Sequence, residues 1–173
     1  MILISVNRLA FYKRNDLAVK AIEKLVKKGY EIIYRVIGEG EEKEKLKSKN
    51  VVLLGNRPHS EVLKEYKEAD IFCLPSEIEG FGIVTLEAMA AGLPFVNSDI
   101  PVHREIESAS HAGLLFKTGD ENDLALKIQQ LIDDKDLYRK LSKNALAFAK
   151  KHTLPLATAD TLAVYLTLCP RKH

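Results

Sequence analysis

Short apolar runs alternate with longer amphipathic stretches along the whole chain. The apolar runs are rich in Val, Ile, Leu and Phe, which predicts buried strands at 2–7, 31–38, 50–55, 70–75, 94–98 and 112–116. Between most of the runs, apolar positions recur at helical spacing, which predicts helices at 16–29, at 59–68, from about Phe81, at 120–133 and at 135–151. A stretch of mixed positive and negative charges predicts a further, solvent-exposed helix within 39–49. The stretch 97–104 is predicted to be a loop.

The predicted strands are continuous apolar runs rather than alternating ones, as expected when helices cover both faces of a parallel sheet. Strands and helices that alternate in this way predict an α/β fold, with a doubly wound, mostly parallel and Rossmann-like sheet. The chain has 173 residues, which is enough for one domain with a substantial core and too few for two. We therefore expect a single domain over 1–173.

Composition narrows the classes of function. The 26 Lys and Arg against 24 Asp and Glu leave a charge of +2, which predicts no nucleic-acid partner and no anionic-membrane footprint. The two cysteines are far apart and no metal-ligand spacing occurs among the five His, which argues against a zinc site or a disulfide framework. No stretch approaches the length of a membrane span, and the start lacks the features of a secretory signal. A soluble, cytoplasmic protein is expected.

The loops after the strands are where a parallel sheet binds ligands. Arg8 and Lys13 follow the first strand, and Gly80 and Gly82 precede a helix after the fourth. Two cations and a helix N-terminus with exposed backbone N–H groups suit a diphosphate. On these residues alone, surface charges and turn glycines are the simpler interpretation. The "GEG" at 38–40 is explained by turn chemistry, since it lacks the third glycine of a dinucleotide-binding motif.

Two acids stand out in the stretch "EIEGFGIVTLEAMAAGLP" at 77–94. The helix that begins near Phe81 is apolar nearly all round, which predicts burial on more than one side and places Glu87 among apolar neighbours. A buried carboxylate needs hydrogen-bond donors, which could be a Lys or Arg, backbone amides or the hydroxyls of a ligand. Glu79 precedes the helix, where it could cap N–H groups or point into the crevice.

The stretch "PSEIEGFGIVTLEAMAAGLP" resembles the signature of retaining glycosyltransferases of the family-4 type, which have the GT-B architecture. Glu79 and Glu87 stand at the spacing of the family's Glu-x7-Glu motif. The resemblance extends to "NRLAFYKR", "RVIGEGEEKEKL", "NVVLLGNRPHSEVLKEYKEADIFCLPS" and "GDENDLALKIQQLIDD". No single motif is specific, but together they cover most of the chain. The resemblance implies the carboxyl-terminal domain of such an enzyme, which binds the nucleotide-sugar donor.

The resemblance also implies roles for individual residues. Arg8 and Lys13 would hold the diphosphate of the nucleotide sugar and stabilise the leaving group, a task that other glycosyltransferases give to a metal. Glu79 would contact hydroxyls of the transferred sugar, and Glu87 the ribose hydroxyls. The backbone of Gly80, Phe81, Gly82, Ile83 and Val84 would lie along the sugar and phosphates, with Asn56 and Arg57 beside the base. A UDP-, GDP- or ADP-sugar is the expected substrate, with no metal and no cofactor.

The sequence departs from the family pattern at several places. Asn7 and Arg14 stand where the family usually has glycine. His103 stands where a glycine is common, and we expect it to be a solvent-facing loop side chain, with an approach to the nucleotide sugar as the alternative. The tail from about 153 matches the family poorly.

The resemblance covers only one half of a GT-B enzyme, and the acceptor-binding domain of the family is absent from these residues. The function expected is transfer of a glycosyl group with retention of configuration, in polysaccharide or glycolipid biosynthesis. An amino-terminal domain or a separate subunit would complete the site, and that part could also provide peripheral membrane contact. The alternative is a non-catalytic nucleotide-sugar binding or regulatory module. A Rossmann-type oxidoreductase lacks its glycine fingerprint here.

Overall fold

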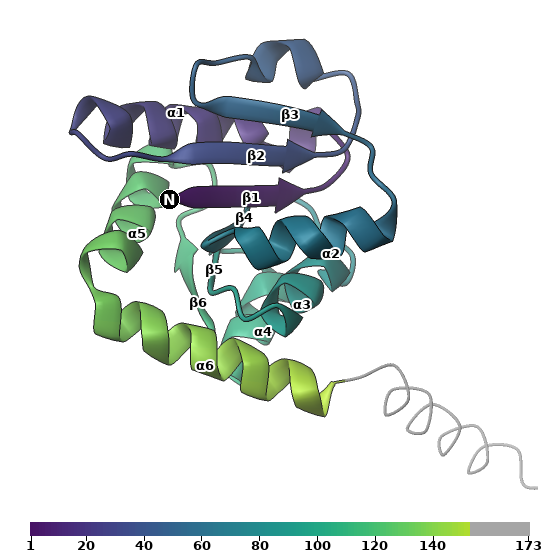
Figure 1. The fold of residues 1–173 in the computed structure, drawn as a ribbon, viewed down its shortest axis with the longest axis vertical. Coiled ribbons are helices and arrows are strands. Elements are labelled where there is room, and N and C mark those ends of the chain that lie inside the picture. The colour runs from purple at the N-terminus through teal and green to yellow at the C-terminus, as the bar shows by residue number, and fades with distance from the viewer. Residues whose placement is uncertain (153–173) are drawn as a thin grey trace, which may run out of the picture.

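A computed structural model of the protein describes residues 1–152, which form one α/β layered structure around a parallel sheet (Figure 1). All strand pairs are parallel, in the order β3-β2-β1-β4-β5-β6. The strands are β1 (Ile2–Val6), β2 (Ile33–Ile37), β3 (Val51–Gly55), β4 (Ile71–Leu74), β5 (Phe95–Ser98) and β6 (Gly113–Phe116). The fold class expected from the alternating pattern is confirmed.

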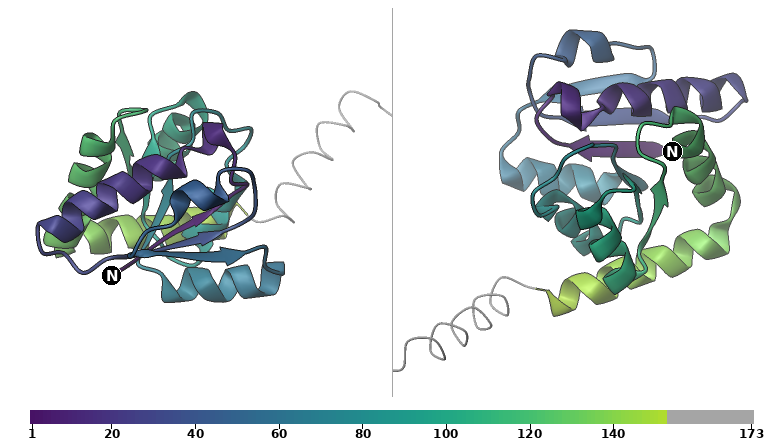
Figure 2. Two further views of the ribbon diagram at one scale, coloured as in Figure 1. Left: turned by 90° about the horizontal axis from the view of Figure 1, so that it is seen from above. Right: turned by 180° about the vertical axis from the view of Figure 1, so that it is seen from behind.

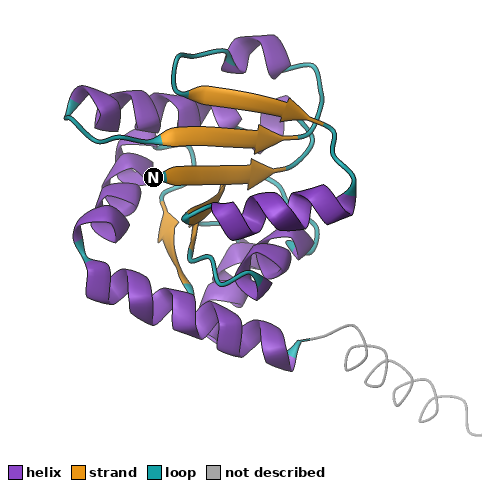
Figure 3. Ribbon diagram, viewed as in Figure 1, coloured by secondary structure: helices purple, strands orange, loops and turns teal. Residues whose placement is uncertain are grey.

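Helices cover both faces of this sheet, as the views of Figure 2 and the colours of Figure 3 show. The helices are α1 (Asn15–Lys27), α2 (His59–Glu68), α3 (Ile83–Ala90), α4 (Pro101–Ser110), α5 (Glu121–Asp133) and α6 (Lys135–Lys151), with short 3-10 turns η1 (Phe11–Lys13) and η2 (Lys43–Leu46). One buried cluster joins the sheet to α1 and α5, and a second joins it to α2, α3 and α6.

Successive residues of the central strands enter opposite clusters, because side chains alternate along a strand. Leu3 belongs to the cluster under α1, while Ile4 belongs to the cluster under α3. Cys73 and Leu74 divide in the same way, and all four side chains are essentially inaccessible to solvent. Burial on both faces explains why these strands read as unbroken apolar runs.

Two predictions of local structure were wrong, one of a helix and one of a loop. The charged stretch within 39–49 forms only the single 3-10 turn η2, because its mixed charges provide just one buried apolar residue, Leu46. Residues predicted as a loop at 97–104 instead enter α4, which begins at Pro101. Proline at the first helical position is a start signal, since the N–H it lacks has no partner there. The helix predicted from about Phe81 begins two residues later, at Ile83.

The strand order fixes where a ligand can enter. From β1 the chain moves outward to β2, and from β4 it moves outward in the opposite direction to β5. The carboxyl ends of β1 and β4 therefore border a crevice at the point where the strand order reverses, which is the usual ligand site of such sheets. The loops that follow these two strands carry Arg8, Lys13 and Glu79.

The predictions for the tail from 153, including Cys169, lie outside the described residues. Cys73 is buried, and burial raises the pKa of its thiol. Within residues 1–152, no helix combines the length and the apolar character that crossing a membrane requires.

Candidate functional site

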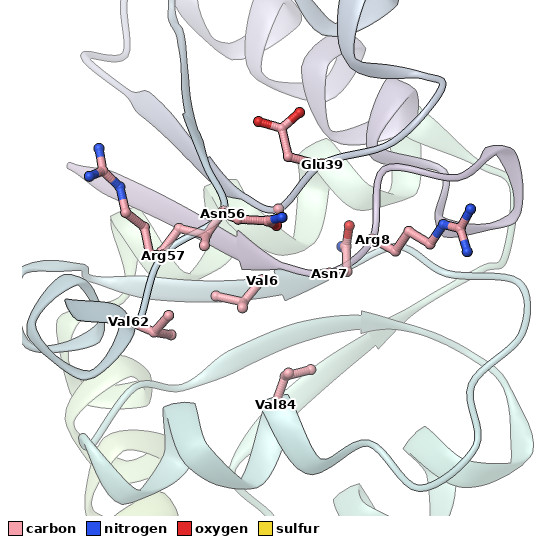
Figure 4. Close-up of a pocket in the computed structure, with 10 residues that line it drawn as sticks. Val6, Asn7, Arg8, Glu39, Asn56, Arg57, Val62 and Val84 are labelled. Atoms are coloured by element: carbon pink, nitrogen blue, oxygen red, sulfur yellow. The ribbon is translucent and has the colours of Figure 1, made fainter. Parts of the chain in front are cut away.

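A cavity of about 440 Å³ opens at the carboxyl ends of β1, β2 and β3 (Figure 4). This volume lies in the range of small-molecule sites. The cavity is lined by Val6, Asn7, Arg8, Ile37, Gly38, Glu39, Asn56, Arg57, Val62 and Val84. The structure thus brings together four residues that the sequence placed in the site, which are Arg8, Asn56, Arg57 and Val84.

The glycines of the "GEG" stretch have a packing role beside this cavity. A Cβ on Gly38 would lie 1.9 Å from the carbonyl oxygen of Asn7, and one on Gly40 would lie 2.3 Å from that of Leu9. Leu9 N–H also donates to the carbonyl of Glu39 at 2.9 Å. The two glycines let the loops after β1 and β2 touch backbone to backbone, which is a packing requirement and not the turn chemistry expected from the sequence.

The two predicted phosphate-binding cations differ in their surroundings. The Arg8 side chain is 73% exposed, and its one ion pair within the described residues is with Glu41, at 4.0 Å. The Lys13 side chain is only 13% exposed and donates from Nζ to Oε1 of Glu79 at 2.7 Å. Arg8 is therefore free to reach a ligand, whereas Lys13 already holds a partly buried acid.

Glu79 joins the loops after β1 and β4. Its side chain is 11% exposed, and its Oε1 accepts hydrogen bonds from Lys13 Nζ and, at 2.6 Å, from Ser76 Oγ. Of the two positions that the sequence allowed for Glu79, helix cap or crevice, the structure has the crevice, because the N-cap of α3 is Gly82 and has no side-chain cap.

Arg14 explains one departure from the family pattern. Its backbone adopts the left-handed conformation, with φ at 50°, which favours glycine. The Arg14 guanidinium pairs with Asp16 and with Glu77, and Glu77 N–H donates to the carbonyl of Tyr12 at 2.8 Å. The side chain thus ties the loop after β1 to the loop after β4, in a backbone conformation that a glycine would adopt without strain.

The segment 80–84 forms the entry to α3. Gly82 has φ at 72° and is followed by the first helical residue, Ile83. A Cβ on Gly82 would lie 2.8 Å from Ile106 Cδ1 of α4, so both conformation and space favour glycine here. Phe81 and Ile83 are among the most exposed large apolar side chains of residues 1–152.

Glu87 is not the buried acid that the sequence predicted. Its side chain is 27% exposed, because α3 packs against the core with Ala88 and Met89 and leaves its other side open. His59 Nε2 lies 2.9 Å from Glu87 Oε1, and Tyr66 OH donates to Oε2 at 3.5 Å. Burial raises the pKa of Tyr66, and the charge of Glu87 raises it further, so the hydroxyl remains a donor.

His103 is not a solvent-facing loop residue either. It lies in the first turn of α4 and is fully buried. Its Nδ1 is 2.9 Å from the carbonyl oxygen of Ser98, at the end of β5. Burial lowers the pKa of His103, while the Ser98 carbonyl and the charge of Glu79 oppose that effect.

Sequence reasoning missed the polar residues that support the acid. Ser98 is the last residue of β5 and Ser76 lies two residues after the end of β4. Both side chains are buried, and Ser98 Oγ donates to the carbonyl of Ser76. Small hydroxyl residues where two apolar runs end were a usable signal. Within residues 1–152, no group of three or more His, Cys, Asp or Glu side chains is placed to hold a metal ion.

The sequence matches a known protein family. The family described as "Glycosyl transferases group 1" matches residues 1–148 of this chain. The uncharacterised glycosyltransferase MJ1178 of Methanocaldococcus jannaschii is 28% identical over 157 residues, which cover 87% of this chain and 43% of that protein. The N,N'-diacetylbacillosaminyl-diphospho-undecaprenol alpha-1,3-N-acetylgalactosaminyltransferase of Campylobacter jejuni is also similar. It is 37% identical over 122 residues, which cover 70% of this chain and 32% of that protein.

Solved structures agree on the fold. HepE of Anabaena, in complex with UDP and glucose, matches with a TM-score of 0.84 and 21% identity, over 96% of this chain and 48% of that one. TarM matches with a TM-score of 0.79 and 26% identity, over 98% of this chain and 35% of that one. The chain therefore spans less than half the length of these relatives and of these structures.

Proposed function

This chain belongs to the group 1 glycosyl transferases, and we propose that it is the domain of a GT-B enzyme that binds the nucleotide-sugar donor. The proposed reaction is transfer of the glycosyl group to an acceptor with retention of configuration, as in the family-4 type. One observation carries the proposal. At the reversal point of the sheet, the structure brings Arg8, Lys13, Glu79 and the start of α3 to one crevice beside a cavity of ligand size.

The phosphates of the nucleotide sugar are assigned to Arg8, Lys13 and the start of α3. Arg8 lines the cavity with an exposed guanidinium, and charge-assisted hydrogen bonds to phosphate are stronger than neutral ones. The backbone N–H groups that begin α3 provide partial positive charge at the same place. Together these groups would stabilise the diphosphate as it leaves, so we expect no metal requirement.

The two acids are assigned to hydroxyls. Glu79 is anchored through Oε1 by Lys13 and Ser76, and it would accept hydroxyls of the transferred sugar. Glu87 stands partly exposed on α3 and would accept the ribose hydroxyls. Asn56 and Arg57 line the far side of the cavity, where they would flank the base (Figure 4).

A second domain is proposed to close the crevice, on the same polypeptide or as a separate subunit. Matched relatives are more than twice as long as the aligned part. The segments that follow β1 and β4, up to the start of α3, expose four large apolar side chains, which are Phe11, Ile78, Phe81 and Ile83. We infer that they form part of a contact surface, because large exposed apolar areas mark such surfaces. An acceptor-binding domain is the proposed occupant, and the names of relatives in capsule and lipid-linked glycan synthesis suggest a polysaccharide or glycolipid acceptor.

Melting curves test the proposal on the chain itself. UDP, GDP and ADP, each with its glucose or mannose conjugate, are added without metal and with EDTA. A ligand at a hundred times its dissociation constant adds about 2.7 kcal/mol to the free energy of unfolding, which raises the melting temperature by several degrees. No shift with any of the six ligands at millimolar concentration would contradict the proposal. Binding without transfer once an acceptor domain is supplied would favour a non-catalytic nucleotide-sugar binding module.

A further inference from the structure

His103 carries a buried polar atom that the proposed function leaves unused. Among residues 1–152, its Nε2 is the only buried side-chain nitrogen or oxygen without a hydrogen-bond partner. Since Nδ1 lies 2.9 Å from the carbonyl oxygen of Ser98, Nδ1 carries the proton and donates, and Nε2 is left with a bare lone pair. An unpaired acceptor in the interior lowers stability, so a polar side chain at this place needs a reason other than folding.

The contact that His103 makes begins a chain of hydrogen bonds toward the crevice. The hydroxyl of Ser98, the residue whose carbonyl accepts from His103, donates to the carbonyl of Ser76. The hydroxyl of Ser76 in turn donates to Oε1 of Glu79 at 2.6 Å. Every member is buried or, in the case of Glu79, 11% exposed, so the bonds are protected from competing water.

The helix that bears His103 also supports the loop that bears Glu79. Ile106, one turn further along α4, would lie 2.8 Å from a Cβ on Gly82. The carboxyl ends of β4 and β5, the start of α4 and the loop 76–82 are thus packed together. A displacement of the His103 ring would be transmitted to the acid through both the hydrogen bonds and this packing.

The anchoring of Glu79 is one-sided. Lys13 Nζ and Ser76 Oγ both donate to Oε1, at 2.7 and 2.6 Å. Within the described part of the chain, Oε2 has no hydrogen-bond partner. A carboxylate held by one oxygen presents the other as an acceptor in a fixed direction, which is what recognition of a sugar hydroxyl requires.

We propose that His103 is a positioning residue for sugar recognition, which acts through Ser98 and Ser76 to hold Oε1 of Glu79 so that Oε2 is free to accept a hydroxyl of the transferred sugar. This inference rests on the proposed function and deepens it. His103 does not touch the nucleotide sugar, because its side chain is inaccessible from the crevice. Its effect is on the sugar alone, and the nucleoside diphosphate is bound by other groups.

The test compares binding of a nucleoside diphosphate with binding of its sugar conjugate by calorimetry, using UDP with UDP-glucose, GDP with GDP-mannose and ADP with ADP-glucose. His103→Phe keeps an aromatic ring and removes the Nδ1 donor, whereas His103→Asn keeps an N–H at nearly the same place. Ser76→Ala breaks the last bond of the chain without changing the core. His111→Asn, at the exposed end of the same helix, is the control.

We expect His103→Phe and Ser76→Ala each to lower the affinity for the sugar conjugate by about tenfold, which is the effect of losing one hydrogen bond to a charged group. The affinity for the diphosphate should stay unchanged within about twofold. The double variant should lose no more than the larger single loss, because both act through one acid. His103→Asn should recover most of the affinity. If His103→Phe does not fold, His103→Leu, which also lacks the Nδ1 donor, takes its place in the same comparison.

Three results would overturn the inference. They are equal losses of affinity for the diphosphate and for the conjugate, unchanged affinity for the conjugate in either His103→Phe or Ser76→Ala, and losses in the double variant that add in full. An unmodified chain that binds none of the six ligands would overturn the proposed function itself, and this inference with it. The two failures are therefore distinguishable in one set of titrations.

Discussion

Lys13 donates to Glu79 across 2.7 Å and so links the loop after β1 to the loop after β4, with both side chains largely shielded from solvent. The two strands are neighbours at the point where the strand order reverses. Lys13, which the proposed function assigns to phosphate, and Glu79, which it assigns to the sugar, therefore neutralise each other's charge. A nucleotide sugar must share Lys13 with Glu79, and this competition shapes the first prediction.

Glu79→Gln should separate the two parts of the ligand. The amide keeps the shape of the side chain but removes its charge, which leaves Lys13 free for phosphate. We expect affinity for the free nucleoside diphosphate to stay equal or rise, while affinity for the sugar conjugate falls by about 1–3 kcal/mol. Calorimetry with both ligands checks this. A Glu79→Gln chain that loses both affinities alike would place the acid outside the sugar site.

Arg8→Ala and Lys13→Ala should each weaken binding of a nucleoside diphosphate by about 1.5–3 kcal/mol more than they weaken binding of the nucleoside. Their effects on stability should differ. Arg8 is mostly exposed and its removal should leave the melting temperature unchanged, whereas removal of Lys13 leaves Glu79 without its cation and lowers that temperature.

Lys20→Ala is the matched control for these two cations, since Lys20 is a half-exposed lysine of α1 whose one ion pair within residues 1–152 is with Asp16, at 3.6 Å. It should change neither affinity nor stability by a measurable amount. Equal losses for nucleoside and diphosphate in Arg8→Ala or Lys13→Ala would assign the altered side chain to some other part of the ligand.

Glu87→Gln should weaken both the free nucleotide and its sugar conjugate by about 1–3 kcal/mol, because the ribose is common to both. Stability should change by less than about 1 kcal/mol, since Glu87 is partly exposed and the side chain of its partner His59 is 66% exposed, so that water screens the pair. Glu107→Gln is the control, because Glu107 is another carboxylate, on α4, that pairs with a histidine, His111. A destabilised Glu87→Gln chain that binds nucleotide normally would mean that the acid serves the fold.

Stability should depend on pH through His103. Burial lowers the pKa of this histidine below its ordinary value of 6.5, so below that pH the unfolded chain takes up a proton that the folded chain does not. This contribution is fully present above pH 6.5 and is lost as the pH falls toward the lowered pKa. Melting curves between pH 7.5 and 5 should therefore fall less steeply in His103→Asn than in the unmodified chain or in His111→Asn. Identical slopes in all three chains would rule out a buried neutral imidazole.

The sheet was predictable from the sequence because its strands are buried on both faces and read as unbroken apolar runs. Alternation of strands and helices placed ligand binding in the loops after the strands, and these loops carry Arg8, Lys13 and Glu79. The strand order, which puts the crevice between β1 and β4, came from the structure. The roles of these residues stay predictions until binding is measured.

Other features could not be read from one sequence. The α3 pattern is apolar all round, and a pattern cannot say which side a second domain would cover, so Glu87 was placed too deep. The α4 pattern is mostly polar, and His103 looked like a loop residue although tertiary packing buries it. Arg14 takes up a left-handed backbone because ion pairs to Asp16 and Glu77 are available, which local propensity does not reveal.

We propose above that this chain binds a nucleotide sugar through its diphosphate without metal. A calorimetric titration, in EDTA, of UDP, GDP and ADP and of one sugar conjugate of each measures this binding directly. We expect a single site that accepts one of the three pairs, in which the diphosphate competes with its conjugate and the nucleoside alone binds far more weakly. Binding that requires added metal, or no binding by any of the three pairs, would contradict it.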